Sequence, residues 1–133
     1  MFRNVFSRKK TPLTGAPVIR RLKTYSAQSG YVYQYSYEGQ RPWRSGAEEG
    51  AEYVFRISAD RKNWTDTSVL VPASTLRPWQ AAHGRELSST ERYAVAKMAL
   101  FQAFDERPAP AGMAAGIRVR AADVEGIVET LGL

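Results

Sequence analysis

YVYQYSY, residues 31–37, places a tyrosine at every second position. A β-strand sends successive side chains to opposite faces, so Tyr31, Tyr33, Tyr35 and Tyr37 are expected to line one face. Valine, glutamine and serine alternate with them and would line the other face. Because that second face is polar, we expect it to meet solvent and the tyrosines to face the core. Each buried hydroxyl would need an acceptor, so some of these tyrosines should lie near the edge of the core.

Further strand patterns lie on both sides of the tyrosine run. The expected strands are residues 18–26, 31–37, 52–59 and 64–71. Residues 41–50, RPWRSGAEEG, are expected to form a polar loop, and Pro72 to end the last strand. The first half of the chain is therefore predicted to be a four-stranded antiparallel β-meander.

The second half has helical patterns. Ser88 and Glu91 have the spacing of a capping box, which predicts the start of a long helix that ends near Glu106. Residues 117–120 suggest a short strand, and residues 121–131 a shorter helix with one apolar stripe. The predicted fold class is α+β: the meander packed against one long α-helix, plus a short C-terminal helix. We expect one domain over residues 18–133, after a basic tail of residues 1–17.

Basic charge is concentrated at the N-terminus. The formal net charge is +6, but residues 1–30 hold seven Lys or Arg and no acidic residue. Residues 31–133 hold 12 basic and 13 acidic residues, so the body of the protein is close to neutral. Such asymmetry is typical of an extension that meets an anionic surface, either nucleic acid or lipid. A solubilising extension is the commoner explanation.

The first residues have a weakly amphipathic pattern. Met1, Phe2, Val5 and Phe6 would form one apolar stripe of a short helix, as in an interfacial membrane anchor. No apolar run reaches the length of a transmembrane helix, and there is no signal-peptide core. We therefore expect a cytoplasmic protein without a transmembrane segment, with at most weak peripheral membrane contact through this tail.

Residues that could carry catalysis are scarce. The chain has no cysteine and one histidine, His83, in an expected loop. Lys97 falls in the aromatic sector of the main helix: either it is buried with a shifted pKa and a chemical role, or, as we favour, its ammonium lies in water. The common phosphate-loop, zinc-protease and nucleophile-elbow motifs do not occur. We lean against an enzyme and expect no metal or cofactor.

One short segment has a familiar pattern. Residues 58–64, SADRKNW, resemble the Asp-box hairpin, Ser-x-Asp-x-Gly-x-Thr-Trp, found on propellers and other β-proteins. The segment is one residue shorter and lacks the glycine and the threonine. The resemblance covers these residues only and implies a hairpin in which Asp60 caps the turn and Trp64 packs beneath it. It implies no activity.

Two binding hypotheses remain, ahead of an enzyme using His83 or Lys97 as the third. The first is a protein-association or adaptor domain, either with another protein or as a homodimer through the main helix. The second is single-stranded nucleic-acid binding, in which bases stack on tyrosines and basic residues contact phosphates. The candidate binding residues are Tyr31, Tyr33, Tyr35, Tyr37, Arg20, Arg21, Lys23, Arg41 and Trp43.

Overall fold

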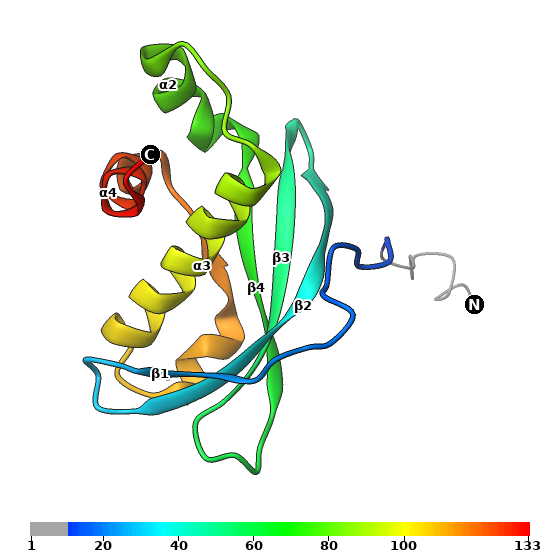
Figure 1. Ribbon diagram of the computed structural model, residues 1–133, viewed down its shortest axis with the longest axis vertical. Coiled ribbons are helices and arrows are strands. Elements are labelled where there is room, and N and C mark those ends of the chain that lie inside the picture. The colour runs from blue at the N-terminus through cyan, green and yellow to red at the C-terminus, as the bar shows by residue number, and fades with distance from the viewer. Residues whose placement is uncertain (1–10) are drawn as a thin grey trace.

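The computed structural model describes residues 11–133 as a curled, five-stranded mixed sheet with helices packed on it (Figure 1). The strands are β1 (Lys23–Ser26), β2 (Val32–Ser45), β3 (Glu48–Ser58), β4 (Thr65–Pro72) and β5 (Ile117–Arg118). The helices are α2 (Ala73–His83), α3 (Ser89–Glu106) and α4 (Ala121–Leu131), and the 3₁₀ helix η1 (Pro110–Ala115) precedes β5. The predicted α+β class is confirmed.

The sheet differs from the predicted meander at one edge. β1 to β4 pair antiparallel in chain order, as expected, but β5 adds a fifth strand that runs parallel to β4, with Val69 opposite Ile117. The pattern of residues 117–120 does suggest a short strand, but nothing local in it specifies the partner. The pairing depends on how η1 returns the chain to the sheet.

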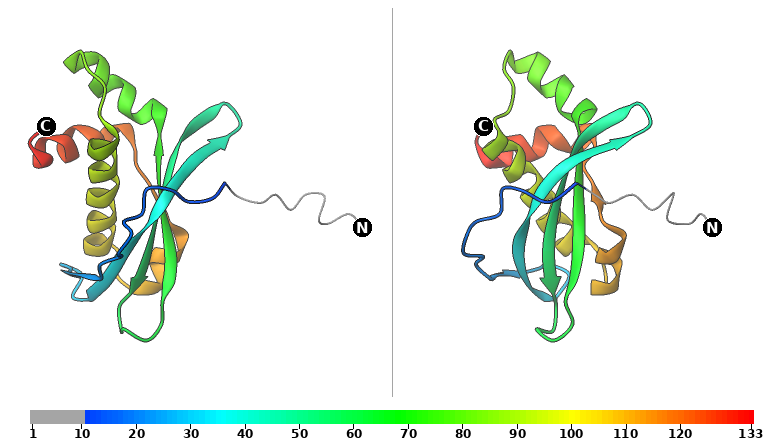
Figure 2. Two further views of the ribbon diagram at one scale, coloured as in Figure 1. Left: turned by 45° about the vertical axis from the view of Figure 1, so that its right-hand side comes forward. Right: turned by 90° about the vertical axis from the view of Figure 1, so that its right-hand side faces the viewer.

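The long β2–β3 hairpin is a second difference. Residues 41–50 continue both strands instead of forming a loop, and the chain turns at Gly46 and Ala47. Gly46 has a φ of 59°, which glycine adopts without steric cost. The end of the hairpin projects beyond the helices (Figure 2), and residues 44–49 are all exposed. A polar sequence is therefore compatible with a strand here.

Residues 73–83 form α2, a helix that the sequence analysis does not predict because prolines begin and interrupt this segment. Pro72 is the residue before the helix, and Pro78 lies inside it. Proline removes one backbone hydrogen bond and crowds the preceding turn. Leu76 and Trp79 are each only 4% exposed, so burial of the apolar face offsets that cost.

The tyrosine run packs against α3, as predicted. The helices lie on one side of the sheet (Figure 2). Tyr33 stacks on Phe104 with ring centroids 4.0 Å apart, and the edge of Tyr35 meets Phe101 at 5.5 Å. Tyr33 and Tyr35 are 0% and 5% exposed, whereas Tyr31 is 38% exposed at the end of the run. The prediction that the tyrosines face the core, with some near its edge, is confirmed.

The opposite face of β2 is less exposed than predicted. Gln34 and Ser36 are only 3% and 8% exposed. Gln34 lies between Thr24 of β1 and Ser58 of β3, and its Nε2 donates to Thr24 Oγ1 at 3.4 Å. Gln34 is thus flanked by strands on both sides and finds a partner in β1, while Ser36 Oγ donates to Glu38 Oε2 within β2 at 2.9 Å.

The β1–β2 turn is fastened to the C-terminal end of α3 through Asp105. The Tyr25 hydroxyl donates to Asp105 Oδ2 at 2.7 Å, and the Gln28 backbone N–H donates to Asp105 Oδ1 at 2.8 Å. Ser29 Oγ also donates to the Phe104 carbonyl at 2.7 Å. These bonds hold β1, and with it Lys23, beside α3.

Replacing Tyr25 by phenylalanine is expected to make the protein less sensitive to alkali. Burial, followed by the hydrogen bond to Asp105 and its charge, raises the pKa of Tyr25 to about 12. The unfolded value is about 10, so the stabilisation is fully present below about pH 10 and is lost as pH rises through about 12. Urea unfolding should show Tyr25→Phe destabilised by about 1–2 kcal/mol near neutral pH. That difference should shrink in alkali, and a difference independent of pH would contradict this linkage.

Candidate binding site

The N-terminal segment runs along the edge of β2 and pairs with it at two places. Thr14 and Gln40 exchange backbone hydrogen bonds of 2.8 Å, and Lys23 lies opposite Tyr35 where β1 begins. Residues 15–22, here called the edge loop, leave the strand between these points, where residues 18–22 were expected to be β-strand. Within the described part of the chain, no backbone hydrogen bond joins the edge loop to residues 36–39. The edge loop is longer than residues 36–39, which it faces, and therefore bows away from β2.

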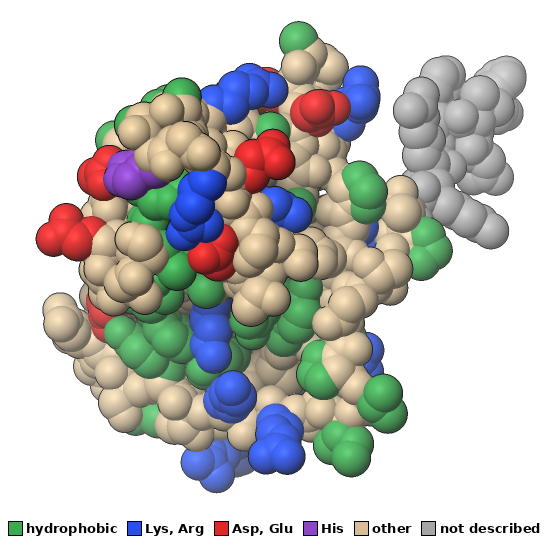
Figure 3. Space-filling model, turned by 45° about the horizontal axis from the view of Figure 1, so that its top comes forward, with side chains coloured by type: hydrophobic (Ala, Val, Ile, Leu, Met, Phe, Trp, Pro, Cys, Tyr) green, Lys and Arg blue, Asp and Glu red, His purple; other side chains and the backbone are tan. Residues whose placement is uncertain are grey.

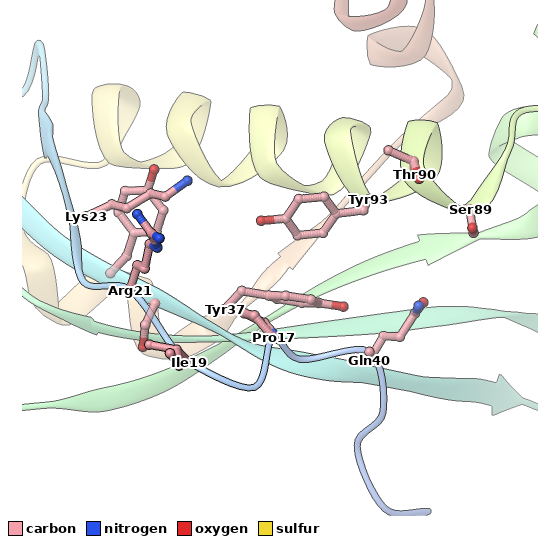
Figure 4. A pocket seen from close by; sticks show the side chains of 12 residues that line it. Pro17, Ile19, Arg21, Lys23, Tyr37, Gln40, Ser89, Thr90 and Tyr93 are labelled. Carbon is pink, nitrogen blue, oxygen red and sulfur yellow. The ribbon is translucent and has the colours of Figure 1, made fainter.

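A pocket of about 500 Å³ lies where the edge loop leaves β2. Its three walls are residues 15–23, the part of β2 from Tyr35 to Gln40, and the start of α3 from Ser89 to Tyr93 (Figure 4). We call it the tyrosine pocket. Its size is within the range of about 300–1,000 Å³ that is usual for ligand sites.

The tyrosine pocket has two polar ends and an aromatic middle. Arg21 and Lys23 lie at one end, and Ser89 and Thr90 in the first turn of α3 lie at the other, beside Gln40 (Figure 4). Between them, the rings of Tyr37 and Tyr93 contact each other with centroids 4.6 Å apart. An elongated ligand with an anionic group at one end and an apolar middle would match this arrangement.

The capping box fixes the hydroxyl end of the pocket. Ser88 Oγ accepts from the Glu91 backbone N–H at 3.1 Å, and Glu91 Oε1 accepts from the Ser88 N–H at 2.8 Å, as predicted. Arg85 donates to the same carboxylate at 2.9 Å. Arg85, followed by the Ser88 N–H, lowers the pKa of Glu91 to about 2. The position of the first turn, and of its hydroxyls, is therefore well defined.

Lys97 of α3 lies next to Tyr35, one of the lining residues of the pocket. Its Nζ is 5.8 Å from the ring centroid of Tyr35 and 5.8 Å from that of Phe101. Burial lowers the pKa of Lys97 from its ordinary value, and the nearby charge of Lys23 lowers it further. Lys97 as a whole is half-buried, as a stem lying on the core would be, and its Nζ lies beside two aromatic rings.

Large apolar side chains are exposed on the edge loop. Val18 is fully exposed, Ile19 is 77% exposed and Leu22 is 58% exposed. Ile19 also lines the tyrosine pocket. On the face shown in Figure 3, Lys and Arg side chains lie in a row beside hydrophobic ones. The pocket is thus bordered by both apolar and basic groups.

The structure separates the residues that the sequence analysis grouped as one binding site. Tyr35, Tyr37, Arg21 and Lys23 line the tyrosine pocket. Tyr31 and Tyr33 instead line a hollow of about 340 Å³ next to Trp64 and η1. The Tyr33 hydroxyl is buried and has no hydrogen-bond partner among the described residues. The ring faces of Tyr33 and Tyr35 are covered by the core, so they do not form an open platform for bases.

The remaining basic candidates are engaged elsewhere. Arg20 lies 3.6 Å from Glu38, and Arg41 donates to Glu52 at 3.0 Å in a largely buried ion pair. The Arg118 guanidinium lies 5.2 Å from the ring centroid of Trp43. Arg41 and Trp43 line a second pocket, and neither lines the tyrosine pocket.

The Asp60 turn has the geometry that the Asp-box resemblance implies. Asp60 Oδ1 accepts from the backbone N–H groups of Lys62 and Asn63, both at 2.8 Å. These bonds and the Asn63 side chain hold the pKa of Asp60 well below its usual range. Trp64 is half-buried next to the turn, and the Arg56 guanidinium lies 5.5 Å from its ring centroid. The Asp60 hydrogen bonds and the Trp64 contact stabilise the turn.

His83 and Lys97, the residues considered for catalysis, have different surroundings. His83 is the last residue of α2, not a loop residue, and its ring stacks on Trp79 at 4.1 Å. His83 Nδ1 lies 2.9 Å from the Trp79 carbonyl oxygen. Within residues 11–133 there is no group of three or more His, Asp or Glu side chains placed to hold a metal ion.

Two predictions concern membranes. None of the helices in residues 11–133 combines the length and the apolar character needed to cross a bilayer. The amphipathic pattern at Met1, Phe2, Val5 and Phe6 lies outside the described residues, so the expected peripheral membrane contact stays a prediction.

Several pocket residues have no binding signal in the sequence. Gln40 belongs to a segment expected to end the tyrosine strand, and Tyr93 reads as part of an apolar helix sector. Ser89 and Thr90 could have been noticed only as hydroxyls in the first turn of a capped helix. Only the packing of α3 across β2 brings them together.

Comparison of this chain with known protein families, with curated proteins and with solved structures finds no match.

Proposed function

We propose that this protein is a non-enzymatic association domain. Its tyrosine pocket binds a segment of a partner protein that carries both acidic and apolar side chains. The observation that carries the proposal is that Arg21 and Lys23 line the same pocket as Tyr35, whose ring centroid lies 5.8 Å from Lys97 Nζ. Within residues 11–133 none of these cations forms an ion pair. An acidic segment would supply the missing negative charge.

The exposed residues of the edge loop support a protein partner rather than a nucleic acid. Ile19 lines the pocket, and Val18 and Leu22 are exposed on the same edge loop; all three would gain from apolar contact, which phosphates and sugars do not offer. A specific nucleic-acid reader usually carries a broad basic patch, whereas residues 31–133 are close to neutral. The buried ring faces of Tyr33 and Tyr35 also weigh against base stacking.

A homodimer through α3 is less well supported than a different partner. α3 packs on the sheet through Leu100 and Phe104, and it also contacts α4. Met98 and Phe101 are partly buried against the core, and Phe101 stacks on Tyr25 with centroids 4.3 Å apart. Little apolar helix surface is therefore left for a second copy, and light scattering at high concentration would detect a dimer directly.

Selection from a displayed library of random linear peptides tests the proposal. Enriched peptides should combine Asp or Glu with a large apolar residue, and fluorescence anisotropy should show binding to the wild-type protein. The double variant Arg21→Glu/Lys23→Glu should weaken binding by about tenfold or more. Lys62→Glu/Arg77→Glu makes the same change in net charge at exposed positions outside the pocket, and should leave binding unchanged.

Two outcomes would overturn the association proposal. The first is enrichment of no peptide, or of peptides that bind both double variants equally. The second is preferential binding of single-stranded oligonucleotides with a steep salt dependence, which would favour the nucleic-acid hypothesis.

A further inference from the structure

We infer that the basic end of the tyrosine pocket is a site for a phosphate monoester, so that the partner segment is recognised in its phosphorylated form. The inference rests on the proposed function and names the acidic group that the segment carries. Arg21, Lys23 and Lys97 would bind the phosphate at the end of the pocket that Tyr35 lines.

The strand register places Lys23 next to Tyr35, and two further cations lie in the same region. Lys23 is the cross-strand partner of Tyr35, so the two side chains leave the sheet on the same face. That face is the one covered by α3, where Lys97 Nζ lies 5.8 Å from the Tyr35 ring centroid. Arg21 lines the same end of the pocket as Lys23 (Figure 4). The segment from Arg21 to Lys23 and helix α3 thus bring cations to the same end of the pocket.

Within residues 11–133 no carboxylate forms an ion pair with this cluster. Asp105 accepts from Tyr25 and from the Gln28 backbone N–H. Glu38 accepts from Ser36 at 2.9 Å and lies 3.6 Å from Arg20. Lys97 is half-buried beside Lys23, so the folded protein holds two like charges together with no counter-charge from these carboxylates. A bound anion would relieve this repulsion.

A phosphate monoester fits this cluster better than a carboxylate. The three side chains carry three formal positive charges, whereas a carboxylate supplies a single negative charge and a phosphate monoester close to two near neutral pH. Its three terminal oxygens can accept from donors arriving in different directions, while the two carboxylate oxygens lie in one plane. Partial burial over the Tyr35 and Phe101 rings strengthens each charge-assisted bond.

Titration with small anions tests the site independently of any peptide. Phenyl phosphate and benzoate share the ring and differ in the anion, and inorganic phosphate lacks the ring. With lysines labelled by ¹³C-methylation, NMR should show phenyl phosphate shifting the Lys23 and Lys97 signals, while the Lys62 signal stays unchanged. Phenyl phosphate should bind about tenfold tighter than benzoate, and Lys97→Gln should remove most of that preference.

The peptide arm uses matched sequences that carry phosphoserine, phosphotyrosine or glutamate at one position. The phosphate inference would be overturned if phenyl phosphate and benzoate bound with equal affinity. It would also be overturned if phenyl phosphate shifted the Lys62 NMR signal as much as those of Lys23 and Lys97. If glutamate peptides bind the pocket as tightly as phosphopeptides, the association proposal stands and the phosphate inference fails. If phenyl phosphate binds and no peptide does, the anion site stands and the association proposal fails.

Discussion

Replacing Phe104 by alanine is expected to lower the free energy of unfolding by about 3–5 kcal/mol. Phe104 is 0% exposed and is the centre of the aromatic cluster between α3 and the tyrosine run. Its ring centroid lies 4.0 Å from that of Tyr33, 5.8 Å from that of Tyr25 and 6.4 Å from that of Tyr35. Removing it would leave a cavity that these rings cannot fill without moving β2.

Urea unfolding followed by circular dichroism would measure this loss. A domain of this size is typically stable by only about 5–15 kcal/mol, so Phe104→Ala should be close to unfolding at elevated temperature. Phe104→Leu fills more of the site and should cost clearly less. Tyr31→Ala serves as a control because Tyr31, at 38% exposed, touches only the margin of the cluster through Tyr33. A loss for Phe104→Ala as small as that of the control would contradict the packing described above.

Alternation and capping were sufficient to predict the elements that depend on local sequence. The tyrosine run predicted which face of β2 meets the core, because successive side chains of a strand point to opposite faces. Ser88 and Glu91 predicted the start of α3 at the residue where it begins. Asp60 predicted a tight turn because its carboxylate accepts from the two N–H groups that follow. In each case the determinant and its effect lie a few residues apart.

Tertiary packing decides the elements that were missed. α2 contains Pro78 and forms because Leu76 and Trp79 are buried, which no local propensity reveals. β5 is a strand only because β4 offers it a free edge. The candidate site has the same origin, since residues from the edge loop, β2 and α3 meet only after folding. The sequence therefore identified Lys23, Arg21 and Tyr35 as candidates, but gave no means of grouping them with Lys97 and Ser89.

Gly39 links the fold to the candidate site. It lies at the bulge in β2 after Tyr37, with a φ of 122° that side-chain-bearing residues rarely adopt. A Cβ at this position would lie 2.8 Å from the Thr14 carbonyl oxygen and 3.0 Å from Leu13 Cβ. Glycine thus permits the close approach in which Thr14 and Gln40 exchange their hydrogen bonds. That contact is the upstream anchor of the edge loop, and the downstream anchor is β1.

Gly39→Ala is therefore expected to release the edge loop at its upstream end and open one wall of the tyrosine pocket. Backbone strain should cost about 1–2 kcal/mol, and loss of the two Thr14–Gln40 bonds about 0.5–1.5 kcal/mol each. Gly46→Ala is the matched control, because Gly46 also has a positive φ, of 59°, but nothing lies within 4 Å of its Cβ position. Hydrogen exchange of residues 11–22 should rise in Gly39→Ala but not in Gly46→Ala. Only Gly39→Ala should bind phenyl phosphate more weakly than the wild type. If both alanine variants exchange and bind alike, the upstream anchor does not hold the pocket wall, and β1 with the Asp105 bonds must be sufficient to position Lys23.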